Sequence, residues 1–290
     1  MKDYVIATAS TCDLDQAWLQ EHNVPVISYT FEIEGSVSED NCTDAAKRKI
    51  FKAMRDGIFP NTSQITTYAY YEFFRNLAED GKTVIFLDMD KAISSSYGNS
   101  LNALEQLKEE MPAADVRIID TRCITIGLGL LVRRAVALKE EGKTADEVTA
   151  WIEANKMKIA HRFMIDDLQW LRHGGRLSNA SAIVGTLLAI KPLIYIPDDG
   201  TLVAYAKVHG RKKATHQLLE DTLKNARKEN NEFVITHSDC PEDAVKFMES
   251  LKEQLPEETP VSIYELGPVI GCHVGPGFLG IVCFTDERKQ

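Results

Sequence analysis

The first half of the chain alternates short β-branched runs with amphipathic helical stretches, and this alternation limits the fold more than any other feature. Strands are predicted at residues 4–9, 24–31, 83–87 and 116–120, with helical patterns between and after them. Parallel strands need long crossover connections, and a helix packed on the sheet is the usual one. The pattern therefore predicts an α/β fold with a mainly parallel sheet and flanking helices over residues 1–155.

The pattern changes after residue 155. Residues 193–197 and 201–208 are predicted to form a hairpin around Asp198-Asp199-Gly200. Helices and strands then alternate, at residues 212–229, 232–237, 242–254 and 261–266. A hairpin beside such strands favours a mixed sheet, so we expect a second α/β domain over residues 156–290. Junctions between domains are favoured ligand sites.

Composition and motifs exclude several classes of function. The 43 acidic residues outnumber the 33 basic ones, and no basic stretch outweighs that background, so no nucleic-acid partner is expected. The six cysteines are scattered without a C-x-x-C pair, so no metal site is expected. The sequence also has no phosphate-binding loop, no serine-hydrolase elbow and no zinc-protease motif.

The start of the chain predicts a cytoplasmic protein. Residues 1–6 run directly into a strand-like segment, without the cationic and apolar regions of a signal peptide. The longest apolar run, residues 180–190, is shorter than the roughly 20 residues that span a bilayer. We therefore expect no integral membrane segment.

Three loops rich in hydroxyl groups fall at strand ends or helix starts. They are Ser10-Thr11, Thr62-Ser63 within a predicted polar loop at residues 61–64, and Ser94-Ser95-Ser96. Hydroxyl groups and the free N–H groups of a helix start can bind an anion. Such residues also cap helices without any ligand. Convergence of the three loops would favour the anion site.

A basic residue follows a glycine pair near the middle of the chain. Gly174 and Gly175 allow a sharp turn after a helix at residues 166–172, because glycine adopts left-handed conformations. Arg176 then precedes an apolar helix predicted at residues 180–190 and ended by Pro192. An arginine at this place either extends to solvent or binds the carboxylate of a ligand acid.

The tail contains a histidine ahead of a glycine-rich turn that leads into the last strand, over residues 271–284. Gly275 and Gly277 permit close approach of the backbone to a ligand, and His273 can donate a hydrogen bond to an oxyanion. A histidine with a purely structural role is the alternative.

Together and in this order, these segments resemble the DegV family. Residues 168–178 are close to the family pattern L-x-x-L-x-x-G-G-R-[IL]-S, residues 185–192 match L-x-I-K-P, and residues 273–277 match its H-V-G-P-G. The opening resembles the family's D-S-T-x-D-L, although Ala9 replaces the first Asp. Members of the family bind fatty acids, and its best-understood branch is the binding subunit of bacterial fatty acid kinase.

The resemblance implies two domains with a ligand tunnel between them. It implies no cofactor, the ligand being a long-chain fatty acid such as palmitate or oleate. The implied carboxylate contacts are Thr62, Ser63, a serine among Ser94, Ser95 and Ser96, Arg176 and His273. The expected lining of the tunnel is Ile183, Leu187, Leu188 and Phe278, although an apolar helix at 180–190 would equally suit a plain core.

The resemblance also implies a non-catalytic role, in which a partner kinase phosphorylates the bound acid. Residues 209–213, His-Gly-Arg-Lys-Lys, are similar to a basic stretch of the family. Two alternatives stay open. One is an α/β hydrolase or acyl transferase that uses a serine of residues 94–96 with His273 as base. The other is a sensor of small anions whose apolar helices are only core.

Overall fold

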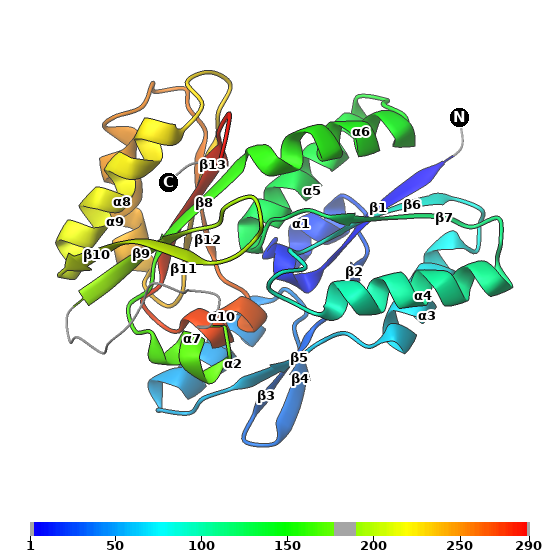
Figure 1. Cartoon of the computed structure of the whole chain (residues 1–290), viewed down its shortest axis with the longest axis horizontal. Coiled ribbons are helices and arrows are strands. Elements are labelled where there is room, and N and C mark those ends of the chain that lie inside the picture. Colours follow the sequence, from blue (N-terminus) through cyan, green and yellow to red (C-terminus); the bar gives the residue numbers. More distant parts are fainter. Residues whose placement is uncertain (1–2, 177–189, 289–290) are drawn as a thin grey trace.

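The computed structural model describes residues 3–176 and 190–288, which form three β-sheets with helices packed around them (Figure 1). The apolar helix predicted at 180–190 lies outside the described residues, except for Ile190. So do Ile183, Leu187 and Leu188.

The predicted parallel sheet is confirmed. Its order is β2-β1-β6-β7, and every pairing in it is parallel. The strands are β1 Tyr4–Ala9, β2 Val26–Ile27, β6 Thr83–Asp88 and β7 Asp115–Asp120. All residues of β6 are buried, because helices cover both faces of the sheet. Figure 1 shows α3 (Thr67–Ala78) and α4 (Ser96–Glu110) on one side, with α5 (Thr125–Glu140) and α6 (Ala145–Asn155) on the other.

A small antiparallel sheet, ordered β4-β3-β5, corrects two predictions. The strand predicted at 24–31 divides into β2 and β3 (Thr30–Ile33), which belong to different sheets. The polar loop predicted at 61–64 begins with strand β5 (Asn61–Ser63), which pairs with β3. An edge strand needs no continuous apolar face, so its polar sequence gave no strand signal. Strand β4 is Ser36–Glu39.

The second sheet is mixed, as predicted, with the order β10-β9-β8-β13-β11-β12. Only the β11–β12 pairing is parallel. The strands are β8 Ile159–Met164, β9 Ile190–Tyr195, β10 Val203–His209, β11 Phe233–His237, β12 Val261–Glu265 and β13 Leu279–Phe284. Helices α8 (Arg211–Asn225) and α9 (Pro241–Lys252) cover one face (Figure 1).

The predicted hairpin is confirmed as β9–β10, but its first strand starts earlier than expected. Pro192 lies inside β9, opposite Lys207 of β10, and so does not end a helix. Its carbonyl accepts a hydrogen bond from Ile165 N at 3.4 Å. Proline has no backbone N–H, so Pro192 cannot donate a hydrogen bond to a neighbouring strand. Its carbonyl can still accept one, which lets it lie within β9.

The expected glycine-rich turn at residue 271 is instead the end of a helix. Helix α10 (Pro268–Val274) begins with proline at its first turn, which suits the missing N–H, and places His273 in its last turn. It packs against α2 (Asp44–Arg55), β3 and β5 of the first half, and against α7 (Gln169–His173). Gly271 permits the contact with α2, because a Cβ there would lie 2.9 Å from Cζ of Phe51.

The remaining elements are short: η1 (Ser10–Cys12), α1 (Gln16–Glu21) and η2 (Lys156–Lys158). One buried apolar cluster fills the first half and continues onto the inner face of the six-stranded sheet, with Phe163, Phe278 and Val282. A second cluster lies between the outer face of that sheet and helices α8 and α9. A division of the chain into domains 1–155 and 156–290 stays a prediction.

Helix α6 offers a direct test of the local energetics. Thr144 accepts a hydrogen bond from Glu147 N, and the Glu147 side chain accepts one from Thr144 N, which is a capping box. We expect Thr144→Ala to lower the unfolding free energy by about 1 kcal/mol, and the Tm by about 2–4 °C. Thr144→Ser keeps the acceptor and is the control. Equal thermal unfolding of the two variants would contradict the role of the cap.

Candidate functional site

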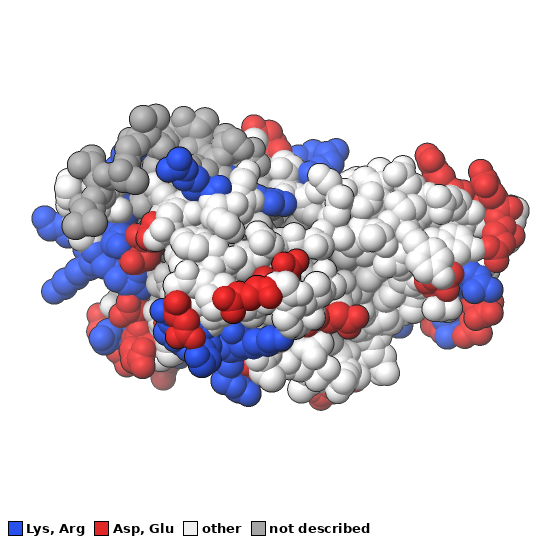
Figure 2. Space-filling model, turned by 90° about the horizontal axis from the view of Figure 1, so that it is seen from below, with Lys and Arg blue, Asp and Glu red and all other residues white. Residues whose placement is uncertain are grey.

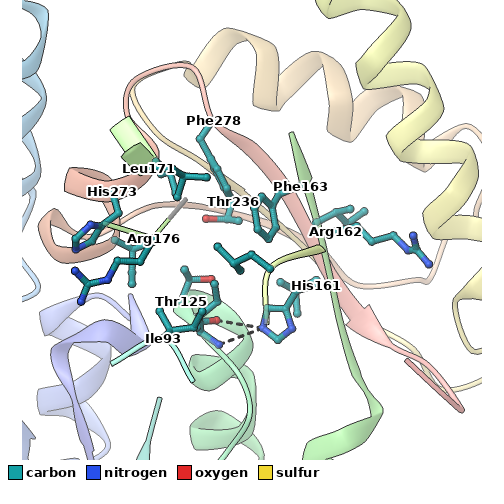
Figure 3. Close-up of a pocket in the computed structure, with 17 residues that line it drawn as sticks. Ile93, Thr125, His161, Arg162, Phe163, Leu171, Arg176, Thr236, His273 and Phe278 are labelled. Atoms are coloured by element: carbon teal, nitrogen blue, oxygen red, sulfur yellow. Dashed lines mark hydrogen bonds between the residues drawn. The ribbon is translucent and has the colours of Figure 1, made fainter. Parts of the chain in front are cut away.

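Two hollows adjoin where the two large sheets face each other. The first is an apolar cavity of about 40 Å³. Its walls come from the inner face of the six-stranded sheet and from residues that follow strands β6 and β7 (Figure 3). The second is a polar pocket of about 280 Å³. Four residues line both hollows, namely Ile93, Arg176, Ile270 and His273.

The polar pocket brings together most of the residues that the sequence suggested. Strand β5 supplies Thr62 and Ser63, and the β6–α4 loop supplies Ser94 and Ser95. Arg176 comes from the segment after α7 and His273 from α10. These segments are distant in sequence, so the convergence depends on the pairing of β5 with β3 and on the packing of α10 against both.

The three serines of residues 94–96 do not all lie in the pocket. Ser94 and Ser95 line the polar pocket, and Ser95 is exposed. Ser96 is completely buried, and its hydroxyl accepts a hydrogen bond from Ile65 N at 3.0 Å. It therefore supports the loop and lies apart from the pocket. The third hydroxyl loop, Ser10-Thr11, is buried and also lies outside this pocket.

His273 is held as a neutral ring. Its Nε2 lies 2.9 Å from Oγ1 of Thr62. Burial, and next the positive charge of Arg176, lower the pKa of His273 to about 4. In the tautomer that carries hydrogen on Nε2, the ring donates to Thr62. That leaves the hydroxyl hydrogen of Thr62 free to point into the pocket.

Glycine is required beside this ring for a steric reason. A Cβ on Gly174 would lie 2.1 Å from Nδ1 of His273. At Gly275, where φ is +77°, a Cβ would lie 2.0 Å from Cδ1 of Trp170. Gly277 has φ of +84° and approaches Cβ of Asp166. These glycines therefore let protein side chains approach the backbone closely around α7 and α10.

Arg176 lines both hollows, and Figure 3 shows it beside His273. Its Nη1 donates a hydrogen bond to the carbonyl of Gly174 at 2.7 Å, which fixes one side of the guanidinium. Within residues 3–176 and 190–288, no carboxylate forms an ion pair with it. A guanidinium has further donors, so it can still bind a carboxylate in the pocket.

The apolar cavity is lined mainly by aliphatic and aromatic groups. Phe278, a predicted lining residue, packs against Phe163 with ring centroids 5.3 Å apart. His161 also lines it, and burial lowers the pKa of its ring to about 3, so the wall carries no charge there. The guanidinium of Arg162 points away from the cavity (Figure 3) and lies over the ring of Tyr205.

Several lining residues gave no signal in the sequence. Tyr29 of the polar pocket lies in the short connection between β2 and β3, and Ile93 lies in a loop. His161 and Thr236 alternate with outward residues on strands of the mixed sheet. These residues line the hollows only because the two halves of the chain pack against each other. The spacing of residues along the sequence does not reveal that packing.

The described residues contain no group of three or more His, Cys, Asp and Glu side chains that could hold a metal ion. No helix formed by these residues is both long enough and apolar enough to cross a membrane.

Comparison with known proteins identifies the family. The family described as "Uncharacterised protein, DegV family" matches residues 4–286. A DegV domain-containing protein of Clostridium perfringens is 36% identical over the whole of both chains. The chain therefore belongs to the DegV family.

Solved structures agree with this assignment. A fatty-acid-binding DegV family protein from Thermus thermophilus is 29% identical, with a TM-score of 0.85 over 98% of this chain and 100% of that one. A fatty-acid-binding DegV family protein from Streptococcus agalactiae is 26% identical, with a TM-score of 0.84 over 99% and 100%. The two-domain DegV architecture of these neighbours matches the fold described above.

Gly174→Ala tests the contact between Gly174 and His273. The backbone of Gly174, with φ of −70°, accepts alanine without strain, but the new methyl group would overlap the imidazole ring. We expect the ring to move away from Thr62, which will change the 15N chemical shifts of the His273 side chain. Gly175→Ala is the control, because it strains the backbone at φ of +71° but its added Cβ would meet no atom within 4 Å. Unchanged shifts in Gly174→Ala would contradict the contact.

Proposed function

We propose that this protein binds a long-chain fatty acid, with the acyl chain in the apolar cavity and the carboxylate in the polar pocket. The observation that carries the proposal is the shared wall of Ile93, Arg176, Ile270 and His273. A molecule with an apolar end and an anionic end could fill both hollows at once. The neighbours from Thermus thermophilus and Streptococcus agalactiae are fatty-acid-binding, which supports the same ligand class here.

The apolar cavity would supply most of the binding free energy. Each methylene that the cavity buries contributes about 0.8 kcal/mol before the costs of association, so the gain grows with the length of acyl chain that enters it. The packed rings of Phe163 and Phe278, with Leu171 and Leu202, offer the apolar surface that this requires. Ile183, Leu187 and Leu188 stay proposed lining residues.

The polar pocket would compensate the charge of the acid. A buried carboxylate without hydrogen-bond partners costs several kcal/mol. Hydroxyl groups of Thr62, Ser63, Ser94 and Ser95 and the guanidinium of Arg176 could all donate to it. His273 would act mainly through Thr62, by holding its hydroxyl in the donating orientation.

We infer that this site is not catalytic. A hydrolase would need His273 beside a serine, but its Nε2 contacts Thr62. Its Nδ1 is buried without a hydrogen-bond partner among the described residues, so no carboxylate orients the ring. With a pKa of about 4, the ring is also a weak general base at neutral pH.

We further propose that a partner kinase phosphorylates the bound acid to an acyl phosphate for phospholipid synthesis. Ser63, Gln64 and Ser95 of the polar pocket are exposed, so a carboxylate there would be accessible from the surface. Lys and Arg side chains gather toward the left end of the face in Figure 2, and Asp and Glu dominate the right end. Exposed Lys212 and Lys213 at the start of α8 are candidate contacts for the kinase, and the cytoplasm is the proposed location.

Extraction of the freshly purified protein with denaturing solvent, followed by mass spectrometry, tests the ligand class. We expect a long-chain fatty acid to be released in a near-equal molar amount, because a carrier of this kind retains its ligand through purification. Protein stripped of lipid should then take up palmitate or oleate. Finding no acyl species and no uptake would refute the proposal.

Arg176→Ala tests the carboxylate contact. Hydrogen bonds to charged groups contribute about 1.5–3 kcal/mol, so the Kd for oleate should rise about 10- to 100-fold. The Kd for methyl oleate, which has no charge, should change much less. Arg172→Ala removes the same charge from an exposed position of α7 and serves as the control. Equal losses for acid and ester would show that Arg176 has only a structural role.

A further inference from the structure

A column of hydroxyl groups leads from the polar pocket down to a buried carboxyl group. The hydroxyl of Ser94 lies 3.2 Å from that of Tyr29. The phenols of Tyr29 and Tyr70 are neighbours in this column, and each affects the pKa of the other. Tyr70 in turn donates to Oδ2 of Asp88 at 3.2 Å. Tyr70 and Asp88 are completely buried, and Tyr29 and Ser94 are nearly so.

Asp88 lies at the carboxyl end of β6, where the elements around it provide little compensation for a negative charge. Met89 N donates to Oδ1 at 2.9 Å, and Tyr70 of α3 donates to Oδ2. The charged neighbour on β7 is Asp120, and Tyr97 of α4 is a further titratable group nearby. No Lys, Arg or His among the described residues forms an ion pair with Asp88. Burial therefore raises the pKa of Asp88 to about 7, against the two hydrogen bonds and with a smaller contribution from Asp120.

Each hydroxyl in the column has one hydrogen, so the direction of one bond affects the next. When Asp88 is ionised, Tyr70 must donate to it, which leaves the Tyr70 oxygen as an acceptor for Tyr29. Tyr29 then accepts from Ser94, and Ser94 has no hydrogen for the pocket. Ser96 N already donates to the Ser94 oxygen at 3.2 Å, so that oxygen gains nothing by facing an anion.

When Asp88 is protonated, the column can reverse. Asp88 donates to Tyr70, Tyr70 to Tyr29, and Tyr29 to Ser94, so that Ser94 points its hydrogen into the pocket. A carboxylate ligand needs donors, and therefore favours this second arrangement. The two anions, ligand and ionised Asp88, also repel each other at the ends of the column.

We propose that Asp88, Tyr70 and Tyr29 are positioning residues that couple the binding of an ionised acid at Ser94 to the uptake of one proton by Asp88. The inference rests on the proposed function. No covalent bond of the ligand changes. In molecules whose Asp88 is ionised, a proton leaves the solvent and binds Oδ2 of Asp88, which balances the charge that the carboxylate adds inside the protein.

The coupling has a consequence for affinity. By linkage, the Kd for oleate rises as the pH increases through the range in which free Asp88 loses its proton. The coupling gains or loses one hydrogen bond from Ser94 to the carboxylate, so we expect the Kd for oleate to change about fivefold over this pH range. An uncharged analogue such as methyl oleate lacks this dependence. His273 does not interfere near neutral pH, because its pKa is lowered to about 4.

Infrared difference spectroscopy at about pH 7.5 reads the proton directly. Oleate carrying 13C in its carboxyl group is added to lipid-free protein, so that bands of the ligand are shifted away from those of Asp. The wild-type chain should gain a carboxylic acid C=O band on binding. Asp88→Asn should lack the band, which assigns it to Asp88.

Tyr29→Phe keeps the ring but breaks the column, so it should bind oleate with a several-fold higher Kd and without the new band. Tyr71→Phe is the matched control. Tyr71 is the next residue to Tyr70 on α3, but its hydroxyl contacts Glu110 at the surface, so the band should stay.

A band that is absent in the wild type, or that persists in Tyr29→Phe or Asp88→Asn, would overturn the relay while oleate binding itself is intact. Failure of the wild-type chain to take up any oleate would refute the proposed function, and the relay with it. Because Tyr29→Phe removes only one oxygen atom, its folding can be checked by thermal unfolding before the spectra are compared.

Discussion

The packing of the inner face of the six-stranded sheet against the first half of the chain is the interaction on which the site depends. One continuous apolar cluster spans that contact, and the apolar cavity lies within it. Alternate residues of β8 and β13 face inward, while their neighbours pack under α8 and α9. The sheet is therefore covered on both faces. A cavity between its inner face and the ends of the parallel strands can be enclosed without exposing the strands to water.

Helix α10 links this packing to the polar chemistry. It contacts α2, β3 and β5 on one side and α7 on the other. Its last turn sets the imidazole of His273 between Thr62 and the backbone of Gly174. The ring is kept neutral by burial, and Arg176 lies beside it. The described part of the pocket thus places a guanidinium among hydroxyl groups, which suits the recognition of an anion better than the transfer of a proton.

Local signals predicted the parts of the fold that local chemistry determines. The turn at Asp198-Asp199-Gly200 closes the predicted β9–β10 hairpin, and Gly200 there has φ of +81°. The predictions failed where tertiary contacts decide. Strand β5 is polar and exists only because β3 pairs with it. Helix α10 is short and contains glycine, so its stability comes from packing against four other elements and not from helix propensity.

The same distinction applies to the site. Residue types that bind anions stood out within their own segments, as with Thr62, Arg176 and His273. Tyr29 and Ile93 did not stand out, and neither did the different places of Ser95 in the pocket and Ser96 beneath it. These features depend on which side chains of the folded loops point inward. The sequence therefore suggested which groups could bind an anion, and the structure shows which other residues line the pocket around them.

The most direct test of the account is a crystal structure with a fatty acid that carries bromine at the end of its chain. Anomalous scattering locates the bromine independently of how the rest of the ligand is interpreted. We predict a bromine peak inside the apolar cavity near Phe163 and Phe278, with the carboxylate among Thr62, Ser94 and Arg176. A peak in the polar pocket, or one outside both hollows, would contradict it.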